Sequence, residues 1–287
     1  WCWGDNSYGQ LGNAALPKSP STTLVPELAD VVEVAAGGWH TCARVTDGTV
    51  YCWGRNEAGQ IGDGSTTHRS TPILIAGVAD VDQLALGKLY SSARLTDGTV
   101  YWWGLKDTRV GPVESPNVLW PTLVPALTDV VEISAGSYIH EWTRSFDIWH
   151  TCARRSDGTV LCWGNAAMGQ LGIGPDYSYI DSPTLLPAFT DVAGIAAGGA
   201  SACAWKADGT LFCWGRNDNG QLGVGDTTGR FAPVLVPLAG VTRVALGDLF
   251  SCAAVTGGAV RCWGGNDYDQ LGDGTNTQRL IPVMIGT

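Results

Sequence analysis

The sequence has few charged residues, and its positive charges are scarce and scattered. Charged residues make up 15% of the 287-residue chain, and 17 Lys and Arg stand against 27 Asp and Glu, which gives a net charge of −10. Contacts from Lys and Arg to phosphates supply most of the affinity for nucleic acids. An acidic chain without a basic cluster is therefore not expected to bind nucleic acid.

Long apolar runs and catalytic fingerprints are also missing. No run approaches the ~20 apolar residues that a membrane-spanning helix needs. The sequence contains no nucleophile elbow, P-loop, dinucleotide fingerprint or His-Glu-x-x-His motif. We therefore predict a protein that is not an enzyme, carries no cofactor and has no membrane span. The chain opens on Trp1 without an initiator Met, and we expect it to be a piece of a longer protein.

The sequence is rich in Gly and Trp, with 39 and 13 copies, and these residues repeat. The dipeptide Trp-Gly recurs at intervals of about 50 residues, at Trp3, Trp53, Trp103, Trp163, Trp214 and Trp263. In each full repeat, three apolar segments precede or include Trp-Gly, and a Pro-flanked segment follows it. Asp-Gly turns such as Asp47-Gly48 suit a hairpin between the second and third segments.

Four antiparallel strands in each ~50-residue repeat are typical of a β-propeller. We predict an all-β fold, a single β-propeller domain spanning residues 1–287, with five whole four-stranded blades and one partial N-terminal blade. The partial blade spans residues 1–29. The whole blades are expected at 30–79, 80–128, 129–190, 191–239 and 240–287.

Nine cysteines occur, and eight of them form pairs ten residues apart: Cys42/Cys52, Cys152/Cys162, Cys203/Cys213 and Cys252/Cys262. The predicted hairpin places each pair directly opposite, at a distance compatible with a disulfide. The second whole repeat replaces both members, with Ser92 and Trp102, as a bonded pair would require. The alternative is that these are reduced, buried cysteines. A zinc site is disfavoured because no Cys-x-x-Cys pair occurs.

Disulfides would place the chain in an oxidising compartment: secreted, periplasmic or at the cell surface. The ninth cysteine, Cys2, is expected to be free. By the spacing of the other pairs, its partner would lie about ten residues before Trp1.

The motif Gly-x-Asn-x-x-Gly-Gln-Leu-Gly after Trp-Gly, preceded by His-x-x-Ala and Asp-Gly-x-Val, resembles the repeat of the regulator of chromosome condensation family. A full copy runs from His40 through Asp47 and Trp53 to Asn56 and Gly62. The resemblance covers nearly the whole chain. It implies a propeller, usually of seven blades. Family members include an exchange factor for a small GTPase, a plant UV-B photoreceptor, secreted β-lactamase inhibitor proteins and bacterial surface proteins. The cysteine-bearing repeat is most similar to the secreted bacterial members.

Two segments depart from the repeat, and both would leave a blade on the same side. One is an insertion at 137–147, between the first and second strands of its repeat. The other is the loop at 105–110, which replaces the Asn/Gly-Gln motif. Exposed Trp, Tyr and Arg dominate binding hot spots, so we predict a site for a protein or glycan partner. Its residues are Lys106, Arg109, Tyr138, His140, Glu141, Trp142, Arg144 and Phe146, beside Trp39, Tyr90 and Phe250. The alternative is a loop that simply folds over the propeller mouth.

We thus predict a non-catalytic extracytoplasmic binding module. Two alternatives remain open: a hydrolase or metalloenzyme in the propeller mouth, using His140, Glu141 and His150, and a guanine-nucleotide exchange factor for a small GTPase. The repeated loop Asn and Gln are expected to satisfy loop backbone rather than contact substrate.

Overall fold

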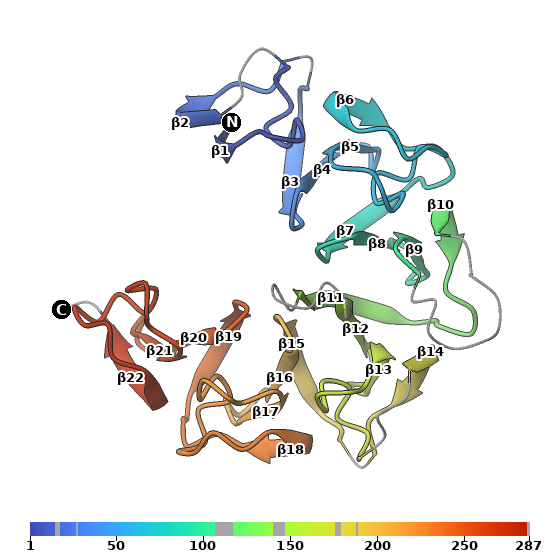
Figure 1. Ribbon diagram of the computed structural model, residues 1–287. Helices are drawn as coiled ribbons and strands as arrows, with labels where there is room; N and C mark the ends of the chain where they lie inside the picture. The colour runs from blue at the N-terminus through green and yellow to red at the C-terminus, as the bar shows by residue number, and fades with distance from the viewer. Residues whose placement is uncertain are drawn as a thin grey trace. The chain divides into compact units, whose positions relative to one another are not determined.

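The computed structural model describes residues 1–14, 18–26, 28–106, 117–139, 147–175, 179–187 and 189–285. These residues form strands and turns, without a helix, and the strands make one two-stranded and five four-stranded antiparallel sheets (Figure 1). The predicted all-β propeller of four-stranded blades is confirmed. The chain divides into two compact units, residues 1–133 and 134–287. The predicted blade boundaries stay a prediction.

The two-stranded sheet pairs β1 (Cys2–Asp5) with β2 (Lys18–Thr23). The four-stranded sheets follow chain order, first strand to fourth. Their strands are β3 (Val31–Ala36), β4 (His40–Val45), β5 (Val50–Gly54) and β6 (Arg69–Leu74); β7 (Val81–Leu86), β8 (Tyr90–Leu95), β9 (Val100–Gly104) and β10 (Val118–Leu123); β11 (Val130–Ile139), β12 (Asp147–Arg155), β13 (Val160–Asn165) and β14 (Tyr179–Leu185); β15 (Val192–Ala197), β16 (Ser201–Lys206), β17 (Leu211–Gly215) and β18 (Arg230–Leu235); β19 (Val241–Leu246), β20 (Phe250–Val255), β21 (Val260–Gly264) and β22 (Arg279–Ile285).

The Asp-Gly hairpins fix the register of the second and third strands. In the first whole blade, Gly48 has φ 81°, a conformation that costs glycine little. The Asp47 carboxylate accepts the Thr49 N–H at 2.8 Å, which closes the turn. The turn places Cys42 opposite Cys52. The same hydrogen bond recurs from Asp97, Asp157 and Asp208.

The four predicted cysteine pairs lie at disulfide distance, with sulfur–sulfur separations of 2.05–2.09 Å. They are Cys42–Cys52, Cys152–Cys162, Cys203–Cys213 and Cys252–Cys262. In the second whole blade Ser92 and Trp102 occupy the equivalent cross-strand positions. Cys2 forms no disulfide. Because a ten-residue separation brought every pair together, the hairpin register inferred from the sequence is correct.

The last cysteine pair differs from the others in its surroundings. Cys262, on β21, is fully buried, whereas Cys252, on β20, is half-buried. The two lie directly opposite each other, as the hairpin register predicts. Since its side chain is closed to solvent, Cys262 is a structural residue of the blade and does not contribute to a binding surface.

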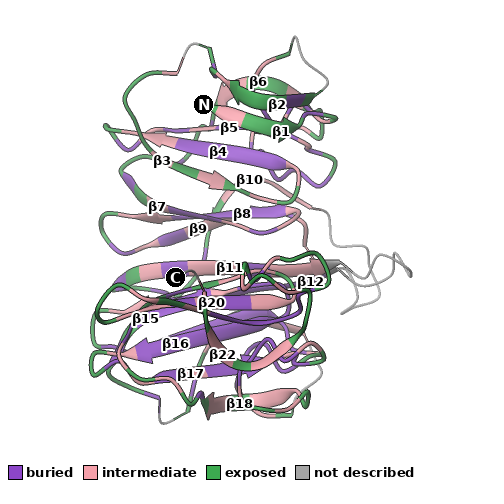
Figure 2. Cartoon of the chain, turned by 90° about the vertical axis from the view of Figure 1, so that its left-hand side faces the viewer, coloured by how far each residue is buried: buried purple, intermediate pink, exposed green. Residues whose placement is uncertain are grey.

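Apolar side chains fill the space between successive sheets of one unit. Cys42 and Cys52 of one blade form a cluster with Val81, Leu84 and Trp103 of the next. In the second unit, Cys203 and Cys213 cluster with Val241 and Val244 in the same manner. The second strands β4, β8 and β16 are mostly buried, whereas the outer strands β2 and β6 are largely exposed (Figure 2). The core of each blade therefore lies along its second strand and not along its outer strand. In the described part of the chain, no helix has the length and apolarity to cross a membrane.

Candidate functional site

In four of the described blades two connections meet at one end, which we call the loop end. They are the connection between the first and second strands and the connection after the third strand. The Arg55 N–H donates to the Trp39 carbonyl at 2.8 Å. Equivalent bonds join Leu105 to Leu89, Arg216 to Ala200 and Gly265 to Leu249. The approach is close: a Cβ on Gly54 (φ 109°) would lie 2.6 Å from the Trp39 carbonyl oxygen. In these four blades the two connections therefore emerge on the same side, while the predicted neighbourhood of the segments 105–110 and 137–147 stays a prediction.

A repeated hydrogen bond, here called the latch, joins consecutive blades at the loop end. The main-chain carbonyl of the loop glutamine accepts the indole N–H of the next Trp-Gly tryptophan at 2.9–3.0 Å. The pairs are Gln10–Trp53, Gln60–Trp103, Gln170–Trp214 and Gln221–Trp263. A hydroxyl on the second strand adds a further bond to the same carbonyl from Thr41, Ser91 or Ser251. Each latch is therefore confined to two neighbouring repeats.

The loop asparagine and glutamine side chains hold their own loop. Asn56 accepts the Ile61 N–H at 2.9 Å and donates to the carbonyls of Ser65 and Thr67. The Gln60 side chain accepts the Ala58 N–H at 3.0 Å. Asn217/Gln221 and Asn266/Gln270 repeat this pattern. The expectation that these residues satisfy loop backbone is confirmed.

At the loop end of the first whole blade, five side chains form what we call the Arg55 cluster: Tyr8, Trp39, Arg55, Glu57 and His68. The Arg55 guanidinium carbon lies 4.9 Å from the centre of the Trp39 ring and 5.0 Å from that of Tyr8. Glu57 accepts from Arg55 Nε at 3.1 Å. The rings attract the guanidinium through their electron-rich faces, and the carboxylate through its charge, so all three contacts favour one position of the Arg55 side chain.

His68 closes the other side of the Arg55 cluster. Its ring meets the Tyr8 ring edge-on, with centres 5.3 Å apart. Its Nδ1 accepts the Asn56 N–H at 3.0 Å, which leaves Nε2 to carry the proton, 3.6 Å from Glu57. Arg55 is 21% exposed, while His68 and Glu57 are 39% and 55% exposed. The cluster is thus ordered but open to solvent.

The second unit carries an equivalent arrangement, the Arg216 cluster of Tyr138, Arg216 and Asp218. The Arg216 guanidinium carbon lies 4.4 Å from the centre of the Tyr138 ring, and Nε donates to Asp218 at 2.8 Å. Although burial opposes it, the bonds to Asp218 and Tyr138 raise the pKa of Arg216. Both arginines directly follow Trp-Gly and precede Asn-Glu or Asn-Asp. The motif Trp-Gly-Arg-Asn-acid is the sequence signal that marks both clusters.

The predicted binding residues divide into four groups. Trp39 and Tyr138 belong to the Arg55 and Arg216 clusters. Tyr90, by contrast, is 1% exposed and packs against Gly87, where a Cβ would lie 2.0 Å from its ring. It is a core residue and does not face a partner. Lys106 and Phe250 are half-buried. Arg109, His140, Glu141, Trp142, Arg144 and Phe146 lie outside the described residues, so a site formed by them stays a prediction.

A buried serine–histidine pair bears on the hydrolase alternative. His40 Nε2 lies 2.8 Å from Ser91 Oγ, and Ser91 lies 2.8 Å from the Gln60 carbonyl. His40 Nδ1 has no partner, and an orphaned lone pair is less costly than an orphaned N–H. The ring therefore donates through Nε2, and the serine hydroxyl donates to Gln60. Burial lowers the pKa of His40 to about 3. In this arrangement His40 does not act as a base toward Ser91.

In the acidic loops that follow the Gln motif, an arginine side chain pairs with the aspartate. The Asp273 carboxylate accepts from Thr275 Oγ1 at 2.7 Å and from Arg279 Nε at 2.7 Å, and these bonds lower its pKa to about 2. Asp63 makes the same contacts with Ser65 and Arg69. In the portions of the chain that are described, no three His, Cys, Asp or Glu side chains are grouped to hold a metal ion. These loops are organised by their own ion pairs.

Models of the regulator of chromosome condensation (RCC1) repeat match residues 1–44, 47–93, 157–205 and 208–254, and a second such model matches 31–60, 192–221 and 241–270. The chain is 34% identical over 249 residues to the human probable E3 ubiquitin-protein ligase HERC4, covering 82% of the chain and 22% of that protein. It is 30% identical over 245 residues to protein pim1 of Schizosaccharomyces pombe, covering 79% of the chain and 35% of pim1. The chain thus spans about a fifth to a third of these relatives.

Solved structures show the same fold. Yeast RCC1 (Prp20), crystallised bound to Kap60, aligns with 99% of this chain and 70% of its own, with a TM-score of 0.77 and 23% identity. Human WBSCR16 aligns with 99% of this chain and 76% of its own, with a TM-score of 0.83 and 22% identity.

Proposed function

Because the chain belongs to the regulator of chromosome condensation (RCC1) repeat family, we propose that it is a non-catalytic binding module whose loop ends contact a partner protein. The observation that carries this proposal is the Arg55 cluster. An arginine fixed between Trp39 and Tyr8 and paired with Glu57 is ordered before any partner arrives. Such a group lowers the entropy cost of binding, and Arg, Trp and Tyr are the residues that dominate contact energies.

Two further features support a binding role. The Arg216 cluster repeats the same chemistry at a second loop end. Among the solved structures, yeast RCC1 was crystallised with the protein Kap60, so a propeller of this fold has a protein partner. The polarity of the His40–Ser91 pair, with the imidazole as donor, argues against a serine nucleophile at that position.

The compartment is part of the proposal. Four cysteine pairs lie at disulfide distance in hairpins that are otherwise well formed, and disulfides persist in oxidising surroundings. We therefore place the module outside the cytoplasm, secreted, periplasmic or at the cell surface.

The test is quantitative capture of partners on the immobilised chain from the surface and secreted proteins of the organism that makes it. Trp39→Ala and Arg55→Ala should each weaken capture of a specific partner about tenfold or more, as expected for hot-spot residues. Arg243→Ala is the matched control, because it removes an equal charge from an exposed position in β19. If all three variants fold normally and bind the partner equally well, the Arg55 cluster is not part of the binding site. If a free glycan competes with capture, the partner that the loop ends contact is a glycan and not a protein.

A nucleotide-release assay on small GTPases addresses the exchange alternative. If the intact chain accelerates nucleotide release from a small GTPase and Arg55→Ala abolishes the acceleration, the function is nucleotide exchange and not binding alone.

A further inference from the structure

We propose that His68 is an acid-sensitive switch of the Arg55 cluster, which keeps Tyr8 ordered beside Arg55 only while its imidazole is neutral. The inference rests on the proposed function for its consequence: a partner that contacts the Arg55 cluster at neutral pH is released in mildly acidic surroundings. Histidine is the side chain whose charge ordinarily changes between about pH 5 and 8.

The main chain fixes the protonation state of one His68 nitrogen. The Asn56 main-chain N–H donates a hydrogen bond to His68 Nδ1 over 3.0 Å. Because a main-chain N–H is always a donor, Nδ1 has to be the acceptor and carries no proton. Asn56 is fully buried, so its N–H depends on an acceptor within the protein. The neutral imidazole is therefore part of the hydrogen bonding that holds this loop.

Protonation of His68 removes this hydrogen bond. A proton taken up from solvent binds at Nδ1, because Nε2 already carries one. The N–H groups of Asn56 and His68 then face each other across the 3.0 Å that the hydrogen bond spanned. A buried N–H without an acceptor is costly. The imidazolium ring therefore moves away from Asn56.

Glu57 attracts the displaced ring. Its Oε1 lies 3.6 Å from His68 Nε2, and its Oε2 accepts from Arg55 Nε at 3.1 Å. The hydrogen bond from Arg55 lowers the pKa of Glu57, so this carboxylate stays charged throughout the range in which histidine titrates. In acid two cations therefore compete for one carboxylate, and the ion pair of Arg55 is weakened.

The same movement removes a contact that orders Tyr8. The Tyr8 ring meets the His68 ring edge-on, with centres 5.3 Å apart, and its centre lies 5.0 Å from the Arg55 guanidinium carbon. Tyr8 belongs to the loop after β1, whereas the other two belong to the loop after β5. Once the His68 ring has moved, the cluster loses part of the order that lowers the entropy cost of binding.

The other charged groups of this loop keep their charge in the same pH range. Asp63 accepts from Arg69 Nε at 2.6 Å. Although burial opposes it, the bonds from Ser65 and Arg69 lower the pKa of Asp63. Arginine stays charged and tyrosine stays neutral at these pH values. The imidazole of His68 is thus the group of the Arg55 cluster that responds.

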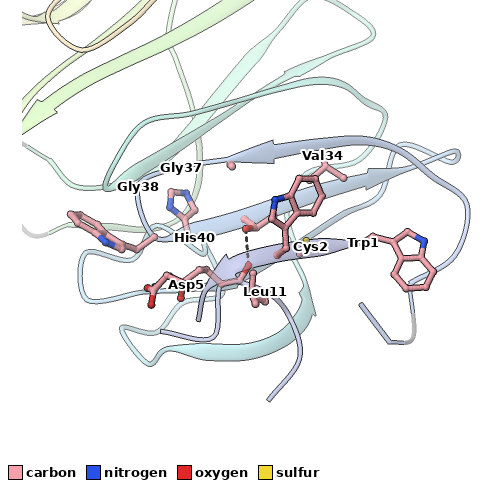
Figure 3. Close-up of a pocket in the computed structure, with 13 residues that line it drawn as sticks. Trp1, Cys2, Asp5, Leu11, Val34, Gly37, Gly38 and His40 are labelled. Atoms are coloured by element: carbon pink, nitrogen blue, oxygen red, sulfur yellow. Dashed lines mark hydrogen bonds between the residues drawn. The ribbon is translucent and has the colours of Figure 1, made fainter. Parts of the chain in front are cut away.

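The other described histidines, His40 and His150, are shielded from this change. The ring of His40 lies against Gly37, where a Cβ would lie 2.2 Å from it (Figure 3). Burial lowers the pKa of His40 to about 3 and that of His150 to about 4. Both rings therefore stay largely neutral in the range in which His68 changes its charge.

The Arg216 cluster supplies an internal control. Gly229 occupies the position of His68, between a threonine and an arginine in both loops. Asn217 corresponds to Asn56, and its side chain makes the same bonds within the loop, to the Leu222 N–H and the Thr228 carbonyl. The two loops thus share the asparagine that organises them and differ in the titrating ring.

Heteronuclear NMR of the intact chain, titrated from about pH 8 to about pH 5, tests the switch without a partner. The Asn56 amide signal and the ring signals of Tyr8 should shift with one common midpoint. His68→Asn should abolish both shifts, because its Oδ1 replaces Nδ1 as an acceptor that does not titrate. The Asn217 amide should not move. An Asn56 signal that stays constant in the native chain, or that titrates equally in the His68→Asn chain, would overturn the proposal.

A second variant tests the part assigned to Glu57. Glu57→Gln removes the negative charge that favours the imidazolium, so the midpoint of the Asn56 shift should move to lower pH. An unchanged midpoint would show that Glu57 does not attract the protonated ring.

Partner capture at two pH values tests the consequence for binding. The native chain should hold a captured partner about tenfold less tightly at about pH 5.5 than at about pH 7.5, because the binding-competent fraction falls. The His68→Asn chain should show equal affinity at both values. An equal fall in the two chains would refute release by His68. If no partner is captured at either pH, the proposed function fails, while the Asn56 titration still decides whether His68 is a switch.

Discussion

At the scale of single residues, the two most repeated motifs of the chain act on each other. The tryptophan of Trp-Gly supplies an indole N–H, and the loop glutamine supplies its main-chain carbonyl to the neighbouring blade. The glutamine side chain in turn holds the loop that presents this carbonyl. A buried indole needs such a partner, which explains why a tryptophan recurs where any large apolar residue would fill the space.

The latch predicts how much the free energy of unfolding falls when one indole N–H is removed. Trp103→Phe should lower the free energy of unfolding by about 1–2 kcal/mol beyond its packing cost, because the indole bond to Gln60 is lost in a buried site. Urea denaturation measures the change. Trp120→Phe is the control, since Trp120 is 54% exposed and its ring contacts Gly64. Equal losses in the two variants would mean that the latch adds nothing.

Two buried histidines predict sensitivity to acid. Burial lowers the pKa of His40 to about 3 and that of His150 to about 4, the latter against an opposing bond from the Ser201 backbone. Between these values and 6.5 the unfolded chain binds more protons than the folded one, so stability falls as pH falls. At about pH 4.5 each histidine should lower the free energy of unfolding by about 3 kcal/mol.

His40→Gln should flatten the dependence of melting temperature on pH between about 6.5 and 4.5. The Asp273 carboxylate, with a pKa of about 2, titrates below this window. A slope that the substitution leaves unchanged would assign the acid sensitivity to other groups.

At the scale of elements, hairpins and their flanking loops fix each blade. The sequence was sufficient to predict the four strands, the Asp-Gly turn and the cysteine register, because each depends on short-range spacing. It was not sufficient for the Arg55 cluster, because Tyr8, Trp39 and Arg55 are far apart in sequence and meet only when two blades pack. The burial of Tyr90 has a different, local cause: Gly87, three residues earlier, has no side chain and leaves the space that the ring fills.

The close approach of two loops predicts a difference between two glycines that both have positive φ. Gly54 and Gly77 have φ 109° and 89°, but a Cβ on Gly54 would lie 2.6 Å from the Trp39 carbonyl oxygen, whereas one on Gly77 meets no described atom within 4 Å. Gly77→Ala should cost about 1–3 kcal/mol of backbone strain, and Gly54→Ala clearly more. Thermal denaturation of the two variants measures this. Equal costs would show that the close approach of the two loops is easily relaxed.

At the scale of the whole molecule, the chain combines a low charge density with hairpins that are closed twice, by hydrogen bonds and by sulfur pairs. The family and its fold were recognisable from the repeat alone, since the motif recurs at fixed spacing. The partner was not, because the side chains of the Arg55 and Arg216 clusters come from different loops that meet only in the folded chain, and their chemistry does not single out one protein.

The sulfur pairs predict one reactive thiol per molecule. Alkylation of the denatured chain without reductant, followed by intact mass, should add one group, at Cys2, and after reduction nine. Each ten-residue loop contributes about 3 kcal/mol at most through the unfolded state, so reductant should also lower the melting temperature. Nine reactive thiols without reductant would refute the pairs and the compartment proposed from them.

Because every standard repeat carries one indole donor and one loop acceptor, the latch also governs how such a gene can change. In-frame duplication or deletion of a whole repeat leaves each remaining indole beside a carbonyl, since donor and acceptor recur with the same period. Unequal recombination between repeats then yields chains whose interfaces between blades are intact from the first generation. A duplicated copy is free to lose its loop motif and diverge, as the segment at 105–110 has done. A bond that spans just two neighbours therefore permits a change in repeat number without loss of the hydrogen bonds between the remaining blades.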